Sequence, residues 1–189
     1  MTHARGWVTA TVTIAGFALL GGCNTASGPQ PSVPLGGHLS SLTVTSKSLP
    51  GDSQIPVDYS CDGKDVSPQL TWSAPPEGTK SIAIVVDDQD SSSGAFTHWI
   101  VIDLPADALS LAEGIDPTTL GAKVGQNDFR SVRYNGPCPP RGELHRYRFW
   151  VYAVDSVLAL SEGVTRSDLD AALSGHLLAA GALKVTFAH

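Results

Sequence analysis

The sequence predicts a mostly β protein with a small helical component. Apolar, often β-branched residues fill short stretches such as 82–86 and 99–104, a pattern typical of buried strands. Gly, Pro, Asn and Asp gather between these stretches and indicate turns. Convincing helical periodicity occurs in one stretch near the C-terminal end. We therefore expect a β-rich domain with one helix.

The first half of the domain is expected to consist of strands and turns. Strands are predicted at 42–46, 70–72, 81–86 and 99–104. Turn-rich segments at 49–68 and 75–78 separate the first three. A polar loop is expected between the last two strands, and it carries Asp87, Asp88, Asp90 and His98.

The second half begins with a possible helical turn at 105–111 and a long loop at 112–140, which is of a length that is usually functional. A strand is predicted at 147–154 and a last one at 183–187. Between them, apolar positions from Leu169 to Ala180 fall on one helical face, and Thr165 with Asp168 resembles a capping box. His176 lies on that face and is interpreted as a core residue.

The composition favours one globular domain. The chain has 189 residues, of which 42% are apolar and 16% charged, enough to bury a sizeable core. Its formal net charge is −6. Nucleic-acid binding is not expected, because it requires clustered Lys and Arg.

The start of the chain predicts export and membrane anchoring. Residues 1–22 have the features of a signal peptide, with an apolar segment of about 13 residues that is too short to span a bilayer. The segment Leu20-Gly21-Gly22-Cys23 resembles a bacterial lipobox, which would place lipid on Cys23 and the protein on the extracytoplasmic face of the cell membrane. Residues 23–38 then form a Pro- and Gly-rich tether, and the domain covers 39–189. An ordinary secretory signal with a chance cysteine is the alternative.

Cys61 and Cys138 remain after Cys23 is assigned to lipid. In an exported protein an even pair of cysteines is more often bridged than free. A disulfide and two free thiols both stay open on the sequence alone.

Two polar clusters point to one binding site. The first holds Asp88, Asp90 and His98, and the second holds His145 and Tyr147 at the start of a strand. A pair of imidazoles could hold a metal, transfer a proton or bind an anion. We expect no metal and no cofactor, because no ligand spacing specific to a metal is present. A serine hydrolase is disfavoured, because the G-x-S-x-G motif is missing.

Several motifs in this order resemble the phosphatidylethanolamine-binding protein family, in its bacterial Raf-kinase-inhibitor-like branch. They are Asp88-Gln89-Asp90, Phe96-Thr97-His98-Trp99, Asn127-Asp128-Phe129, Tyr134 to Pro140, and Gly142 with His145-Arg146-Tyr147. The likeness runs from about residue 42 to 187. Gln89 departs from the family, which usually has Pro there, and this would loosen the turn without removing either carboxylate.

The resemblance implies a large antiparallel sheet packed on a smaller sheet, with a C-terminal helix beside an anion pocket. By the same resemblance, the ligand would be a phospholipid head group or another small phosphate-bearing anion, and no reaction is expected. The residues implied to bind it are Asp88, Asp90, His98, Gly136, Pro137, His145 and Tyr147. An alternative from the same family is an inhibitor of a kinase or serine protease that acts through surface contacts, with an unknown protein target.

Overall fold

The computed structural model describes residues 39–189. The predicted signal peptide, the predicted lipid attachment at Cys23 and the predicted tether all fall in residues 1–38, outside the described part. The strands are β1 Ser40–Ser41, β2 Val44–Thr45, β3 Leu70–Trp72, β4 Ser81–Asp88, β5 Phe96–Pro105, β6 Ser110–Leu111, β7 Lys123–Val124, β8 Leu144–Val154 and β9 Leu177–Ala188. The helices are α1 Arg166–Leu173 and the 3-10 turns η1 Val57–Tyr59 and η2 Pro117–Leu120.

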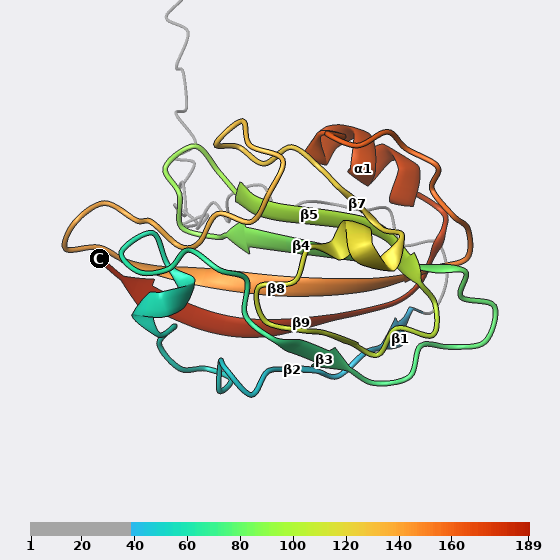
Figure 1. The fold of residues 1–189 in the computed structure, drawn as a ribbon, viewed down its shortest axis with the longest axis horizontal. Helices are drawn as coiled ribbons and strands as arrows, with labels where there is room; N and C mark the ends of the chain where they lie inside the picture. Colours follow the sequence, from blue (N-terminus) through green and yellow to red (C-terminus); the bar gives the residue numbers. More distant parts are fainter. Residues whose placement is uncertain (1–38) are drawn as a thin grey trace, which may run out of the picture.

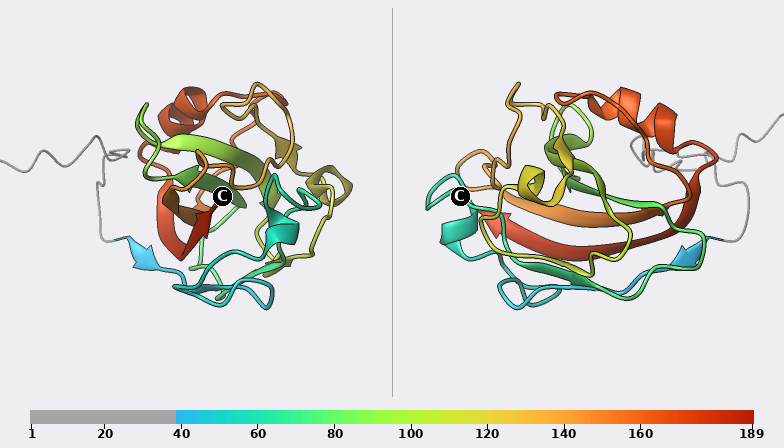
Figure 2. Two further views of the ribbon diagram at one scale, coloured as in Figure 1. Left: turned by 90° about the vertical axis from the view of Figure 1, so that its left-hand side faces the viewer. Right: turned by 45° about the vertical axis from the view of Figure 1, so that its right-hand side comes forward.

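Two sheets form the framework, which confirms the predicted fold class. The large sheet has the strand order β1-β9-β8-β4-β5-β7, and the small sheet has the order β2-β3-β6. The expected antiparallel pairing holds throughout except that β1 runs parallel to β9. Figures 1 and 2 show the small sheet and α1 on opposite sides of the large sheet.

Strand β4 lies in the middle of the molecule because both of its faces are covered. Ile82, Ile84 and Val86 belong to the core shared with the small sheet, whereas Ala83 and Val85 belong to the core under α1. All eight residues of β4 are buried. A strand covered on both faces is continuously apolar, which explains why this stretch was the clearest strand signal in the sequence.

The predicted C-terminal helix is too long. The helix ends at Leu173, Gly175 adopts a left-handed conformation with φ of 82°, and β9 begins at Leu177. The apolar residues 177–180 therefore lie in a strand. His176 is not a core residue: its side chain is half exposed and contacts Asp155. The N-terminal cap is confirmed, since the Thr165 side chain accepts a hydrogen bond from the Asp168 N–H.

Two further predictions near strand ends need correction. Of the single strand expected at 42–46, only Val44–Thr45 is a strand, β2. β1 precedes it at Ser40–Ser41, and the chain passes between the two from the large sheet to the small one. Leu42 lies between them and donates its N–H to the Ala180 carbonyl at 2.9 Å. Instead of a helix, the segment after Pro105 contains one turn, closed by the Ala108 N–H, and then β6.

Candidate functional site

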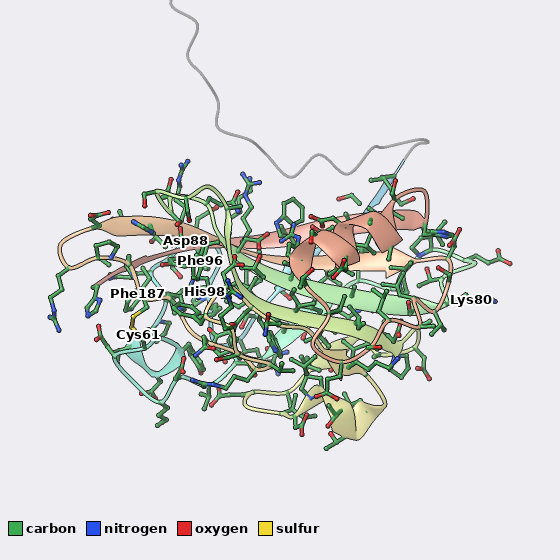
Figure 3. The ribbon with its side chains drawn as sticks, turned by 90° about the horizontal axis from the view of Figure 1, so that it is seen from above. Cys61, Lys80, Asp88, Phe96, His98 and Phe187 are labelled. Carbon is green, nitrogen blue, oxygen red and sulfur yellow. A yellow bond between two sulfur atoms is a disulfide. The ribbon has the colours of Figure 1, made fainter. Side chains whose placement is uncertain are left out.

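The polar residues predicted at 88, 98, 145 and 147 come together at one end of the large sheet. Asp88 is paired with Tyr147 of β8 on one side and with Phe96 of β5 on the other. Since side chains alternate along a strand, Asp88 shares the face of Ile84 and Val86. Figure 3 shows Asp88, Phe96 and His98 at this end, opposite Lys80. Asp88 and His98 therefore lie on strands rather than in the connecting loop.

A β-bulge brings His98 to this face. Asp87 pairs with Thr97 and Val86 pairs with Trp99, so His98 is the extra residue on β5. Thr97 points to the opposite face, where its hydroxyl donates to Asp87 at 3.1 Å. The His98 ring instead packs against the Tyr147 ring, with centroids 5.4 Å apart. Bulges commonly re-aim a side chain in this way beside functional sites.

His145 is held between two carboxylates. Its Nδ1 lies 2.7 Å from Oδ2 of Asp88, and its Nε2 lies 3.1 Å from Oε2 of Glu143. Burial lowers the pKa of His145, but the hydrogen bonds to Asp88 and Glu143 outweigh it and leave the pKa above the ordinary histidine value. The ring is therefore positioned as an imidazolium that donates from both nitrogens.

His98 has the opposite character. Its Nδ1 faces the carbonyl oxygens of Asn135 and Gly136 at 2.9 and 3.1 Å. Burial lowers the pKa of His98 below the ordinary histidine value, and the two carbonyl contacts oppose this only in part. The edges of Phe96 and Phe129 also pack against this ring, which excludes water from its surroundings.

Tyr147 adds a neutral hydroxyl. The side chain is fully buried, and its hydroxyl has no hydrogen-bond partner among residues 39–189. Burial raises the pKa of this phenol well above its ordinary value, and the charge of Asp88 raises it further. Tyr147 thus stays protonated, and its hydroxyl can donate a hydrogen bond to a ligand.

The other acids near the site have structural partners. Asp90 forms an ion pair with Arg146 and also accepts from the Arg146 N–H at 2.8 Å, and the Arg146 side chain holds the pKa of Asp90 below its usual range. Asp87 lies on the opposite face of the sheet and accepts two hydrogen bonds from Nη1 of Arg166 at 2.6 and 2.7 Å. Of the acids predicted for the loop, only Asp88 contacts a histidine of the site.

The wall beside His98 is built from the segment at 134–138. A Cβ added to Gly136 would lie 2.3 Å from the Tyr59 carbonyl oxygen, so only glycine fits there. The Gly136 N–H donates to Asp65 at 2.6 Å, and the Pro137 carbonyl accepts from the Cys61 N–H. Cys61 and Cys138 are joined by a disulfide, which resolves the alternative left open by the sequence and fastens this wall to η1.

Sequence reasoning left out two residues that shape the site. Glu143 contacts His145 but was not among the residues predicted to bind the ligand. Asn127 is buried, and its side-chain amide donates to the His98 carbonyl at 3.1 Å and to Oδ1 of Asn135 at 2.8 Å. Asn127 begins one of the quoted motifs, so a signal was present, but its buried hydrogen bonds become visible only in the structure.

Within residues 39–189, Cys61, Cys138 and His189 bring three possible metal-ligand atoms within 4.8 Å of one another. Both cysteines are bridged and so supply no thiolate ligand. None of the helices in this described part of the chain has the length and apolar character needed to cross a bilayer.

The chain is similar to several known proteins. The protein-family profile for phosphatidylethanolamine-binding proteins matches residues 45–188. A protein of Aquifex aeolicus described as a UPF0098 protein is 44% identical, and the match covers 73% of this chain and 83% of the relative. The Mycobacterium tuberculosis protein with the name "Putative lipoprotein LppC" is 36% identical over 82% of this chain and 83% of its own length.

A solved structure supports the fold. The crystal structure of Escherichia coli YbcL, described as a new member of the mammalian PEBP family, superposes with a TM-score of 0.73. The two sequences are 30% identical, and the match covers 79% of this chain and 99% of YbcL.

Proposed function

The chain belongs to the phosphatidylethanolamine-binding protein family, and from that premise we propose that it binds a small phosphate-bearing anion, such as a phospholipid head group, between His98, His145 and Tyr147. The observation that carries the proposal is the Tyr147 hydroxyl, which is buried near Asp88 without a hydrogen bond of good geometry among residues 39–189. His145 lies two residues earlier on the same face of β8 and is held by two carboxylates. A buried donor without a partner is costly, and an anion oxygen would satisfy it.

The two aspartates near the site do not oppose an anionic ligand, because each is paired with a basic side chain. The carboxylate of Asp88 is compensated by His145, and that of Asp90 by Arg146. Asp88 also accepts from the Asp90 N–H at 2.8 Å, so neither of its oxygens is left free to face a ligand. The incoming anion would accept a hydrogen bond from the Nε2–H of His145, in place of the exposed carboxylate of Glu143.

We propose binding without an intrinsic reaction. A histidine can act as a general base only when one ring nitrogen is unprotonated, and the two carboxylates beside His145 favour its protonated form. Asp88 is likewise engaged by hydrogen bonds on both oxygens. His145 and Asp88 are therefore arranged to hold an anion rather than to remove a proton, and we propose that the neutral ring of His98, which is packed against Phe96, Phe129 and Tyr147, contributes to binding alone.

We further propose that the domain is tethered by lipid on Cys23 outside the cytoplasm. Support comes from the lipobox-like sequence and from the lipoprotein name of the Mycobacterium tuberculosis relative. The Cys61–Cys138 disulfide also favours an oxidising compartment.

The binding proposal is tested by calorimetry with phosphoethanolamine on the full chain in detergent. A charge-assisted hydrogen bond contributes about 1.5–3 kcal/mol, so His145→Ala should weaken binding roughly ten- to a hundredfold. His176→Ala is the matched control, because His176 also pairs with an aspartate but is exposed and outside the site. Equal affinity in wild type and His145→Ala would refute the proposed site.

A further inference from the structure

The His98 ring has a fixed direction of hydrogen bonding. A carbonyl oxygen can only accept, so Nδ1 must carry the hydrogen that is directed at Asn135 and Gly136. In a neutral imidazole the other nitrogen then has a lone pair and no hydrogen. Both hydrogen bonds of the ring to residues 39–189 use Nδ1, and Nε2 makes none to this part of the chain. It is therefore an acceptor.

The surroundings favour the neutral ring. His98 is 2% exposed, and burial lowers its pKa. The acidic groups that act on it are Asp88 and Asp87. Each is compensated by another cation, Asp88 by His145 and Asp87 by Arg166. The remaining neighbours of the ring are aromatic.

The site therefore combines two donors with one acceptor. His145 offers a hydrogen on Nε2, and Tyr147 offers its hydroxyl hydrogen. His98, packed against the Tyr147 ring, offers a lone pair. A fully ionised oxyanion such as sulfate has only acceptor oxygens, and one of them would face this lone pair without a hydrogen between them.

We propose that the site selects an oxyanion that retains a proton, namely the monoanion of a phosphate monoester or of inorganic phosphate, whose P–OH donates to Nε2 of His98. This inference rests on the proposed function and adds the protonation state and ester class of the ligand. Phosphodiesters and sulfate, which lack that proton, are rejected. The ligand is then a free head group such as phosphoethanolamine, which is a monoester, and the diester phosphate of an intact phospholipid is excluded. The same principle makes sites that hydrogen-bond a substrate hydroxyl discriminate strongly against analogues without one.

The chemistry of phosphate supplies matched probes. A phosphate monoester loses its second proton with a pKa of about 6, so methyl phosphate at pH ~5 carries one negative charge and one hydroxyl. Dimethyl phosphate carries the same charge and no hydroxyl. Sulfate has the same tetrahedral shape as inorganic phosphate and no hydroxyl at this pH. Comparing the first pair holds charge constant, and comparing sulfate with inorganic phosphate holds size constant.

The test is calorimetry of the full chain in detergent with these four probes at that pH. A buried acceptor left without its donor costs about 1–3 kcal/mol, so methyl phosphate should bind at least about tenfold more tightly than dimethyl phosphate, and inorganic phosphate similarly more tightly than sulfate. Phosphate and sulfate binding within twofold of each other would overturn the selectivity but leave the proposed function intact. Failure of all four probes to bind would overturn both.

Two variants assign the selectivity to His98. His98→Gln can keep an N–H for the wall carbonyls and present an oxygen acceptor, so it should retain the preference for methyl phosphate. His98→Leu has no acceptor and should bind the two esters within about threefold of each other. An unchanged preference in folded His98→Leu would contradict the role of His98.

Nitrogen NMR of ¹⁵N-histidine-labelled wild-type chain gives a readout that needs no variant. At the same pH, His98 should show a protonated Nδ1 and an unprotonated Nε2, whereas both nitrogens of His145 should be protonated. A doubly protonated His98 ring would overturn the inference.

Discussion

Glu143 and a bound phosphate would compete to accept the same hydrogen bond, the one donated by the Nε2–H of His145. Glu143 is exposed and its charge would also repel the anion. We therefore expect Glu143→Gln to bind inorganic phosphate about two- to fivefold more tightly at low ionic strength, the size typical of an exposed charge interaction. Glu77→Gln, in an exposed turn before β4, is the control. Weaker phosphate binding by Glu143→Gln would indicate that Glu143 supports the site instead.

The same contact affects how binding depends on pH. Glu143 and Asp88 raise the pKa of His145, so the donor cation is present below that pKa and is lost as the pH rises through it. Phosphate affinity should fall over this range. Removing the charge of Glu143 should move the fall to lower pH, which the same titrations would measure.

At the scale of single residues, the family motifs identified most of the site positions in advance. They did not indicate which acids form ion pairs with an arginine: Asp90 pairs with Arg146, and Asp87 pairs with Arg166. They also did not indicate the opposite protonation of the two histidines. Those properties depend on which carbonyls and carboxylates the fold places around each ring, and many of these come from distant parts of the chain.

At the scale of elements, the buried pair of Asp87 and Arg166 joins β4 to α1. The Asp87 side chain is fully buried, and that of Arg166 is 15% exposed. Removing one partner of a buried pair leaves the other charge buried without compensation, which typically costs about 3–5 kcal/mol. Arg166→Met should therefore lower the free energy of unfolding by roughly that amount. Urea denaturation would measure it.

Lys64→Met is the control for that measurement, because Lys64 pairs with Asp58 at the exposed surface, where solvent screens the pair, and its loss should leave the free energy of unfolding nearly unchanged. If Arg166→Met is as stable as this control, the pair does not hold the helix to the sheet.

The strands were easier to predict than the helix. Strands β4, β5 and β8 are long and buried, so their composition alone identifies them. The residues from Leu177 fit both a helical face and a strand, and the pairing of β9 along β8 decides between the two. The left-handed Gly175 was the local sign of the boundary. The bulge at His98 has no counterpart in the hydrophobic pattern and could not be read from it.

At the scale of the whole molecule, the site depends on segments that are remote in sequence. The wall at Gly136 is held by Asp65 and by the disulfide to Cys61, and no periodicity in the sequence links these segments. The family resemblance supplied the two-sheet architecture, which is a non-local property. The parallel β1–β9 pair and the short strands β6 and β7 went unpredicted, because two residues carry too little pattern.

The proposed lipid anchor makes a prediction for the intact protein. Two acyl chains give stable membrane attachment, because each buried methylene contributes about 0.8 kcal/mol. Cys23→Ser should therefore move the protein from the detergent phase to the aqueous phase in a phase-partitioning experiment. Wild-type-like recovery of the variant in detergent would rule out Cys23 as the anchor.

The central claim, that one phosphate-bearing anion lies between His98 and His145, is tested most directly by titrating phosphoethanolamine into the ¹⁵N-histidine-labelled full chain. The resonances of His98 and His145 should shift together and saturate with one dissociation constant, while His176 stays unchanged. If only His176 or His189 responds, or if the two site histidines saturate at different concentrations, the anion does not bind between them.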